Sequence, residues 1–194
     1  MYNIQTAALS ETRFADEGQL TEVKAGYTFF WSGRSSDERR EAGVGFAIRS
    51  NLFSKLASLP KRFNDRLMST QLPLKGKRHA TFISAYAPTM THPEETKDKF
   101  YEDLESLIAS VPKEDKLVIL GDFNARVGAD YQTWEGVIGR NKIDKSNSND
   151  HLLLKSCAAH DLLITNTDFC IPNRNKTSWV HPRSEHCISF ITSL

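Results

Sequence analysis

The chain has 194 residues, of which 39% are hydrophobic and 25% are charged, and its formal net charge is +1. This composition is typical of a globular protein that is long enough to build one sizeable core. The small net charge excludes a protein that holds nucleic acid by bulk positive charge, so binding would depend on local basic patches. The sequence predicts no membrane span or signal peptide, and its three cysteines indicate free thiols in a nuclear or cytoplasmic compartment.

Short apolar segments along the chain predict strands separated by turns. No repeat, low-complexity segment or linker interrupts them, which indicates a single unit. The strands are expected near residues 4–10, 27–31, 43–49, 66–72, 79–86, 117–121 and 162–166.

Two helices are predicted from capping residues and apolar stripes. A proline and two glutamates open a segment over residues 93–110, and its stripe closes before the next proline. Ser148, Asn149 and Asp150 are interpreted as the cap and first-turn acid of the second helix. The stripe residues are Phe100, Leu104, Leu107 and Ile108 in the first helix, and Leu152, Leu153, Leu154, Cys157 and Ala158 in the second.

A pair of polar residues follows the aliphatic strand at residues 117–120. Asp122 and Asn124 are two positions apart, so their side chains point to the same side of an extended chain. A carboxylate at this position can orient and deprotonate a water, while a carboxamide can hold that carboxylate or a phosphate oxygen. The alternative is an Asx turn, in which the two side chains only bind local backbone amides.

Two further strands end in polar residues. Residues 7–12 contain Glu11, and residues 82–88 contain Tyr86 shortly before a proline. In order and separation, the three segments resemble the endonuclease/exonuclease/phosphatase family of magnesium-dependent phosphodiesterases, and most closely the apurinic-type endonuclease domain of non-LTR retrotransposons. The resemblance runs from about residue 3 to 184 and is carried by AALSETRF, GYTFFWSG, REAGVGFAIR, RHATFISAYAPTM, GDFNARVG and NKTSWVHPRS.

The resemblance implies a role for each matching residue. Glu11 would bind Mg²⁺ or Mn²⁺, and one carboxylate is sufficient because Mg²⁺ retains several waters. Tyr86 would hydrogen-bond the phosphate or the leaving oxygen. Asp122 would position the attacking water, and Asn124 would hold Asp122 and the scissile phosphate.

Three more residues would bind the substrate. Thr177 and Trp179 match the Thr-x-Trp segment of the family, which shapes the pocket wall, and Arg126 follows the Asp-x-Asn segment. Each assignment has a structural alternative. Glu11 would be an exposed acid at a strand end, Tyr86 an aromatic residue at the edge of the core, and Trp179 a packing residue.

The resemblance also implies the fold, an α/β four-layer sandwich of two packed, mainly antiparallel sheets flanked by helices. We expect the domain to occupy residues 1–186 and to lack its first strand and helix and its last strands, so that it is incomplete at both termini. Residues 187–194 are expected to form an aberrant tail. Cys187, Ile188 and Ser189 stand where the family pattern reads Trp-His-Leu, and one deleted nucleotide in those codons yields them, which indicates a frameshift.

The expected activity is weak or absent because the C-terminal Asp and the closing Ser-Asp-His of the family have no match. Groups that act in the transition state work as a unit. Asn149-Asp150-His151 resembles the closing triplet, but it precedes Thr177 and opens a helix. The alternatives are a nuclease rescued by another histidine, and a non-catalytic protein-interaction module that retains the fold.

The expected partner of an active chain is the phosphate backbone of DNA, bound by basic loops with Trp134 or Trp179 available to stack. The alternative is a solvated surface, because acidic residues lie close to each basic cluster. Unpaired sheet edges also predict self-association. The clusters are Arg34, Arg39 and Arg40; Lys75, Lys77, Arg78 and His79; Arg140, Lys142 and Lys145; and Arg174 with Lys176.

Overall fold

In the computed structural model, the chain forms two compact units. The first unit comprises Met1–Tyr86 and Ser110–Gly121, and the second comprises Ala87–Ala109 and Asp122–Leu194. The structure describes residues 4–56, 58–74, 76, 78–125, 127–128, 130–139 and 148–168, and the backbone of residues 179–180, 187–188 and 191–192.

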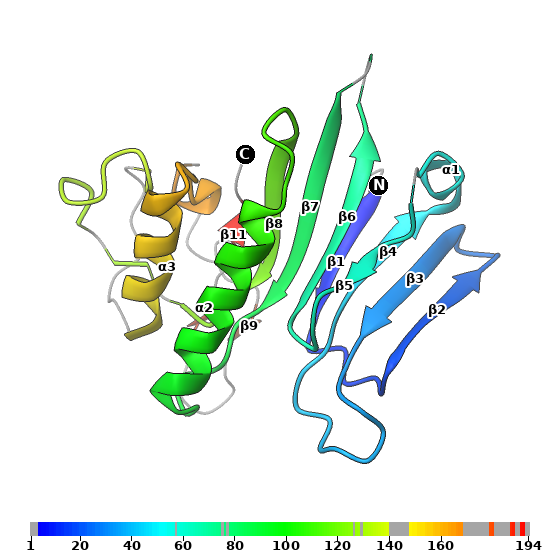
Figure 1. Cartoon of the computed structure of the whole chain (residues 1–194), viewed down its shortest axis with the longest axis horizontal. Helices are drawn as coiled ribbons and strands as arrows, with labels where there is room; N and C mark the ends of the chain where they lie inside the picture. The colour runs from blue at the N-terminus through cyan, green and yellow to red at the C-terminus, as the bar shows by residue number, and fades with distance from the viewer. Residues whose placement is uncertain are drawn as a thin grey trace. The chain divides into compact units, whose positions relative to one another are not determined.

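The first unit contains an antiparallel sheet in the order β1-β4-β3-β2 (Figure 1). Strand β4 lies between two neighbours and is almost entirely buried, whereas β3 alternates between buried and half-buried residues. This alternation follows from the two-residue period of side chains along a strand. The bounds are Thr6–Ser10 for β1, Glu17–Glu22 for β2, Tyr27–Ser32 for β3 and Val44–Arg49 for β4, which leads into the short helix α1 at Ser50–Phe53.

A second sheet completes the first unit, with its strands in the order β8-β7-β6-β5. Strand β7 pairs antiparallel with β6, from Leu67 opposite Ala85 to Pro73 opposite His79. The bounds are Lys61–Arg62 for β5, Leu67–Pro73 for β6, His79–Tyr86 for β7 and Lys116–Asp122 for β8.

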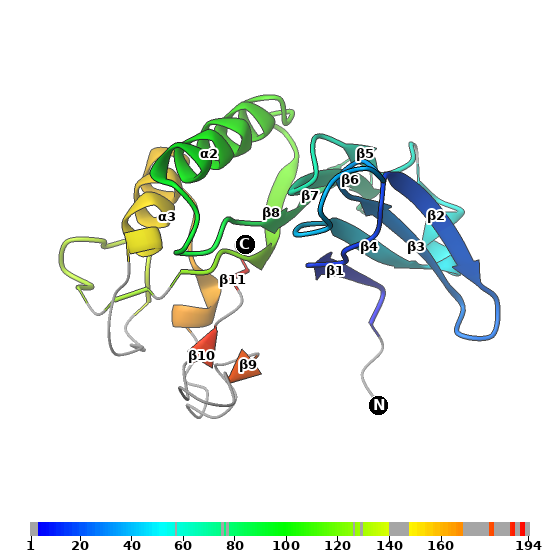
Figure 2. The same ribbon diagram turned by 90° about the horizontal axis from the view of Figure 1, so that it is seen from below.

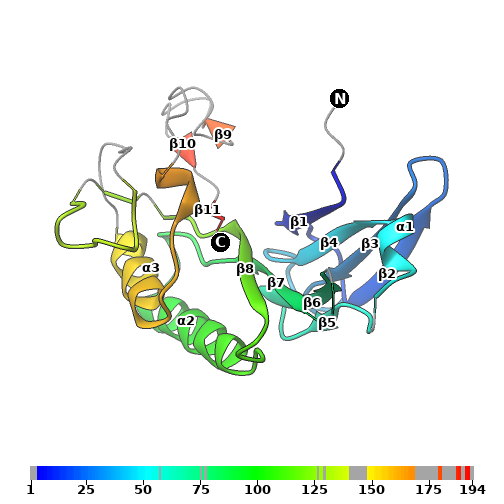
Figure 3. The same cartoon turned by 90° about the horizontal axis from the view of Figure 1, so that it is seen from above.

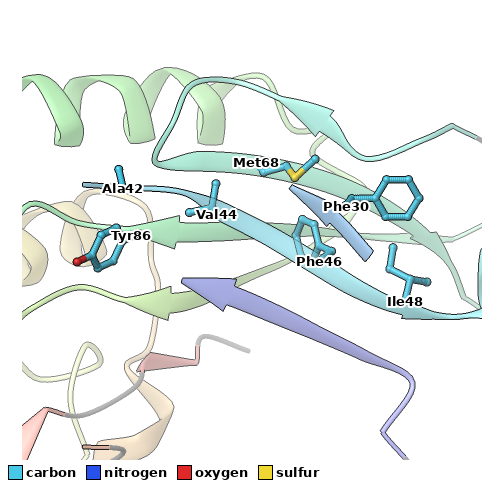
Figure 4. Packing of buried hydrophobic residues seen from close by; sticks show 7 residues of the cluster. All are labelled: Phe30, Ala42, Val44, Phe46, Ile48, Met68 and Tyr86. Carbon is cyan, nitrogen blue, oxygen red and sulfur yellow. The ribbon is translucent and has the colours of Figure 1, made fainter. Parts of the chain in front are cut away.

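The two sheets of the first unit enclose an apolar cluster (Figure 4). Each large apolar side chain buried in this way contributes about 1.5–3 kcal/mol to folding. Tyr86 lies at one end of the row, and Phe30 and Ile48 lie at the other. Tyr86 therefore packs at one end of this core. The cluster comprises Phe30, Ala42, Val44, Phe46, Ile48, Met68 and Tyr86.

The second unit is built around two helices, α2 and α3, which lie side by side (Figures 2 and 3). Phe100 of α2 packs edge-on against Phe123, with 6.3 Å between the ring centroids. The bounds are Glu94–Ala109 for α2, Ser148–Ala159 for α3, Thr165–Thr167 for the 3-10 helix η1, Trp179–Val180 for β9, Cys187–Ile188 for β10 and Ile191–Thr192 for β11. No helix in the described part of the chain is both long and apolar enough to cross a membrane.

Most of the predicted elements are confirmed. The helix expected at residues 93–110 is α2, and its four stripe residues are all buried. The strand expected near residues 162–166 is wrong, because Ile164 forms only an isolated parallel bridge to Ile138 and a 3-10 turn follows it. Strand β2 was not predicted, since five of its six residues are exposed and it has no apolar alternation. The domain boundary at residues 186 and 187 stays a prediction, because 181–186 lie outside the described residues.

Cys157 is a buried thiol in α3, and burial raises its pKa to about 12. Tyr101 of α2 is also buried, and burial raises the pKa of its hydroxyl group. An unfolded cysteine ionises near pH 8.5 and an unfolded tyrosine near pH 10. Above these values the unfolded state loses protons that the folded state retains, so the free energy of unfolding falls as the pH rises.

We expect the alkaline loss of stability to begin near pH 9, continue toward pH 12 and become smaller in C157A. Urea unfolding at a series of pH values measures it, in a background in which Cys170 and Cys187 are replaced by serine. A thiol reagent at pH 8 should leave Cys157 unmodified until urea unfolds the chain. Rapid modification of the folded protein would show that the thiol is accessible and would contradict this prediction.

Candidate functional site

Glu11 begins the loop that follows β1 in the first unit. Its side chain is exposed, and its carboxylate forms an ion pair with Arg13. The backbone N–H groups of Thr12 and Arg13 donate to the carbonyls of Gly43 and Ala42, both at 3.1 Å. The loop that presents Glu11 is therefore tied to the chain just before β4.

The backbone of this loop is strained. Glu11 has a φ of 56° and Arg13 a φ of 55°, in the left-handed region that L-residues other than Asn and Asp seldom adopt. Each residue held in this conformation lowers the stability of the fold by about 1–3 kcal/mol, and such residues are concentrated at functional sites. The described non-glycine residues with positive φ are Glu11, Arg13, Asp16, Asn124 and Asp161, and two of them are predicted site residues.

Tyr86 ends β7 and is only 6% exposed. Two hydrogen bonds join this strand end to the end of β1: Ser10 Oγ donates to the Ala85 carbonyl at 3.2 Å, and Ser84 Oγ donates to the Leu9 carbonyl at 3.4 Å. The structure therefore brings together the two chain segments that carry Glu11 and Tyr86. The hydrogen bond and charge interaction with Glu11 raise the pKa of Arg13.

Arg66 lies against Tyr86 and was not predicted as a site residue. Its guanidinium carbon is 5.4 Å from the centroid of the Tyr86 ring, and its Nη1 donates to the Tyr86 carbonyl at 3.2 Å. Arg66 is only 6% exposed, and burial lowers its pKa. Its Nη2 has no hydrogen-bond partner among the described residues. A buried cation over an aromatic face holds the ring in place. No local sequence pattern around Arg66 indicated this contact.

Asp122, Phe123 and Asn124 form a turn in the second unit, here called the Asp122 turn. The backbone N–H of Asn124 donates to Asp122 Oδ1 at 2.8 Å, and Asn124 has a φ of 48°. Asn124 Nδ2 donates to the Ala87 carbonyl at 2.8 Å, and the Ala87 N–H donates to the Asp122 carbonyl at 2.9 Å. The Asx-turn alternative is thus present in the structure, and the same hydrogen bond fixes the orientation of the Asp122 carboxylate.

Asn149 of α3 is hydrogen-bonded to this turn and to the chain segment that contacts it. Its Nδ2 donates to the Pro88 carbonyl at 3.0 Å and to the Asn124 carbonyl at 3.2 Å. Helix α3 begins at Ser148 and has Asp150 in its first turn, which agrees with the predicted helix start. The interpretation of Asn149 as a capping residue is incomplete, because its side-chain amide binds two distant carbonyls. Nothing in its local sequence distinguishes it from a cap.

The other predicted substrate-binding residues are not placed by the structure. Thr177 and Arg126 lie outside the described residues, and only the backbone of Trp179 is described, in β9. Trp134 is half-buried and lies edge-on to the exposed His151, with 6.0 Å between the ring centroids.

One basic cluster is fully described. Arg34 pairs with Asp65 at 2.9 Å and with Glu41 at 3.9 Å, and Arg39 pairs with Glu41 at 2.9 Å. This agrees with the solvated-surface alternative for that cluster, because the charges of Arg34 and Arg39 are compensated locally. Residues 75, 77, 140–147, 174 and 176 of the other clusters lie outside the described part of the chain.

Among the described residues, few side chains could hold a divalent metal. No three or more His, Cys, Asp or Glu side chains of the described residues are grouped so as to hold a metal ion. Glu11 is an exposed carboxylate at a strand end, which fits a hard cation that takes one or two carboxylates and several waters. Its ion pair with Arg13 is exposed, so water and salt weaken it and a metal can displace it.

Comparisons with known proteins agree with the predicted family. A sequence profile described as the Endonuclease/Exonuclease/phosphatase family matches residues 7–180. Craniofacial development protein 2 of Bos taurus is 32% identical over 181 residues, which cover 93% of this chain and 29% of that protein. The protein of the same name from Tragulus javanicus is also 32% identical over 181 residues, which cover 93% of this chain and 30% of that protein. The chain thus spans less than a third of these curated relatives.

A solved structure has a similar fold. The AP endonuclease LMAP from Leishmania major superposes with a TM-score of 0.61 at 12% sequence identity, covering 97% of this chain and 69% of that one. The predicted fold class is confirmed: two mainly antiparallel sheets with few helices, in an α/β sandwich like the endonuclease/phosphatase fold. The predicted self-association has no support in these findings.

Proposed function

Because the chain belongs to the endonuclease/exonuclease/phosphatase family, we propose that it is a magnesium-dependent DNA endonuclease of low turnover, derived from a non-LTR retrotransposon. Members of this family generally depend on a divalent metal, and a nuclease-like fold suits a nucleic-acid substrate. The observation that carries the proposal is the Asp122 turn, in which a backbone N–H at 2.8 Å orients the carboxylate.

Asp122 would orient the attacking water and accept its proton. A positioned carboxylate typically accelerates such a step about 10²–10⁴-fold. The left-handed conformation of Asn124 supports this role, because it brings the donor N–H back onto the carboxylate two residues earlier. Asn124 Nδ2 is bonded to the Ala87 carbonyl, so we assign Asn124 mainly to holding Asp122.

Glu11 would hold the magnesium ion, which when bound would polarise a phosphate oxygen as a Lewis acid. Tyr86 would donate a hydrogen bond to the phosphate or to the leaving oxygen. Arg66 supports this role of Tyr86 because it binds both the ring and the carbonyl of that residue. We propose Thr177, Trp179 and Arg126 as substrate-binding residues on the basis of the family motif.

Low turnover is proposed because the residues from Cys187 onward depart from the family pattern. In the family pattern this segment supplies the aspartate that supports the catalytic histidine. Removing one member of such a group lowers turnover directly.

A nicking assay on supercoiled plasmid tests the proposal, with the purified chain in Mg²⁺ and in Mg²⁺ plus chelator. We expect slow conversion to open circles that stops when the metal is chelated. Conversion that persists with chelator would contradict metal dependence. No conversion above the no-enzyme blank would contradict the nuclease assignment and favour the alternative of a protein-interaction module.

A further inference from the structure

Asn149 is a deeply buried polar side chain that is hydrogen-bonded to the Asp122 turn. It is 2% exposed, and its amide nitrogen lies within hydrogen-bond distance of two carbonyl oxygens, from Pro88 and Asn124. Both neighbours can only accept hydrogen bonds, so the NH₂ end of the amide must face them. The orientation of Asn149 is therefore fixed by chemistry.

The two carbonyls belong to segments far apart in the sequence. Pro88 is 61 residues and Asn124 is 25 residues away from Asn149. Asn124 also bonds Ala87, which precedes Pro88. Asn149 thus joins the chain just after Tyr86 to the Asp122 turn, through the first turn of α3.

We propose that Asn149 is a positioning residue for Asp122. This inference rests on the proposed function and adds a residue to it. The hydrogen bond from Asn149 holds the Asn124 carbonyl, and the rest of Asn124 is held by its bonds to Asp122 Oδ1 and to Ala87. Fixing this residue on three sides fixes the N–H that orients the Asp122 carboxylate.

Space filling alone does not explain why this residue is an asparagine. An apolar side chain at a 2% exposed position of α3 would fill the space without the cost of burying an amide. The Oδ1 atom of Asn149 has no hydrogen-bond partner among the described residues, so part of that cost is not recovered. Compared with an apolar residue, the asparagine adds two hydrogen bonds, from Nδ2 to the carbonyls of Pro88 and Asn124.

The first experiment measures hydrogen exchange of the Asn124 backbone amide by NMR in the wild type and in N149L, which removes both donors and keeps the branch at Cγ. We expect this amide to exchange about tenfold faster or more in N149L than global unfolding accounts for. L153A is the matched control, because Leu153 is equally buried in α3 but has no bond to the turn. Equal effects of N149L and L153A at equal stability would overturn the proposal.

A wild-type measurement covers the case in which N149L does not fold. The side-chain NH₂ of Asn149 should exchange at least about a hundredfold more slowly than that of the exposed Asn51, because both of its hydrogens are bonded and buried. Similar exchange rates for the two asparagines would overturn the proposal.

The second experiment measures nicking by N149L at a temperature where the variant is folded. We expect kcat to fall about tenfold with little change in KM, as for a group that acts through the orientation of Asp122. An unchanged kcat would overturn the positioning role. If the wild type does not nick DNA, the proposed function fails, whereas the exchange experiments still decide whether Asn149 holds the turn.

Discussion

D122N is expected to lower the rate of magnesium-dependent nicking by about 100-fold or more. The substitution replaces the proton-accepting carboxylate with a neutral amide of nearly the same shape. The carbonyl oxygen of the new side chain can still accept the 2.8 Å hydrogen bond from the Asn124 N–H. The turn should therefore persist, and the loss should come from the missing charge and basicity. Initial nicking rates on supercoiled plasmid measure the effect.

D98N is the matched control for this prediction. Asp98 is exposed on α2, so its neutralisation changes the net charge by the same amount and should leave nicking unchanged. Equal urea midpoints for D122N and the wild type would show that the fold is intact. A D122N chain that nicks at the wild-type rate would remove Asp122 from the chemistry and leave it as a turn residue.

E11Q separates metal binding from proton transfer. The amide is a weaker ligand for a hard cation, so E11Q should require a higher Mg²⁺ concentration for half-maximal nicking. E95Q on the exposed face of α2 is its control. A metal dependence equal to that of the wild type would assign Glu11 only to its ion pair with Arg13.

The sequence indicated Asp122 and Asn124 because their positions after an apolar strand are a local pattern. It could not indicate Asn149, because local capping preferences explain that residue equally well while its partners lie 25 and 61 residues away. Arg66 was missed for the same reason, since its contact with Tyr86 depends on the pairing of β6 with β7. Supporting residues such as Asn149 and Arg66 can be identified only from the tertiary structure. The motifs that they support can be identified from the local sequence.

The same contrast applies to the secondary structure. Helix α2 follows from a periodic apolar stripe, and its buried residues agree with that stripe. Strand β2 is exposed on both sides, so the backbone pairing with β3 defines it and its side chains give no signal. Leu162 and Ile164 are buried, but they lead into a 3-10 turn, and burial alone does not distinguish these conformations.

G121A is expected to lower the free energy of unfolding by about 3–5 kcal/mol. Gly121 has a φ of +149°, and a Cβ atom there would overlap the backbone carbonyl of Ala85 in the neighbouring strand β7. A backbone atom in a sheet cannot move aside as a flexible side chain can, so the strands would have to separate. The glycine therefore permits the close approach of β8 to β7 at the residue preceding Asp122.

G26A isolates the cost of the backbone conformation from the cost of the overlap. Gly26 also has a positive φ, +71°, but no atom beyond its two chain neighbours lies within 4 Å of the added Cβ. Its substitution should cost only about 1–2 kcal/mol, the penalty for an L-residue in the left-handed region. Urea unfolding of both variants gives the difference. If G121A proved no less stable than G26A, the overlap with Ala85 would be relieved by a small shift, and the close approach of the two strands would not require glycine.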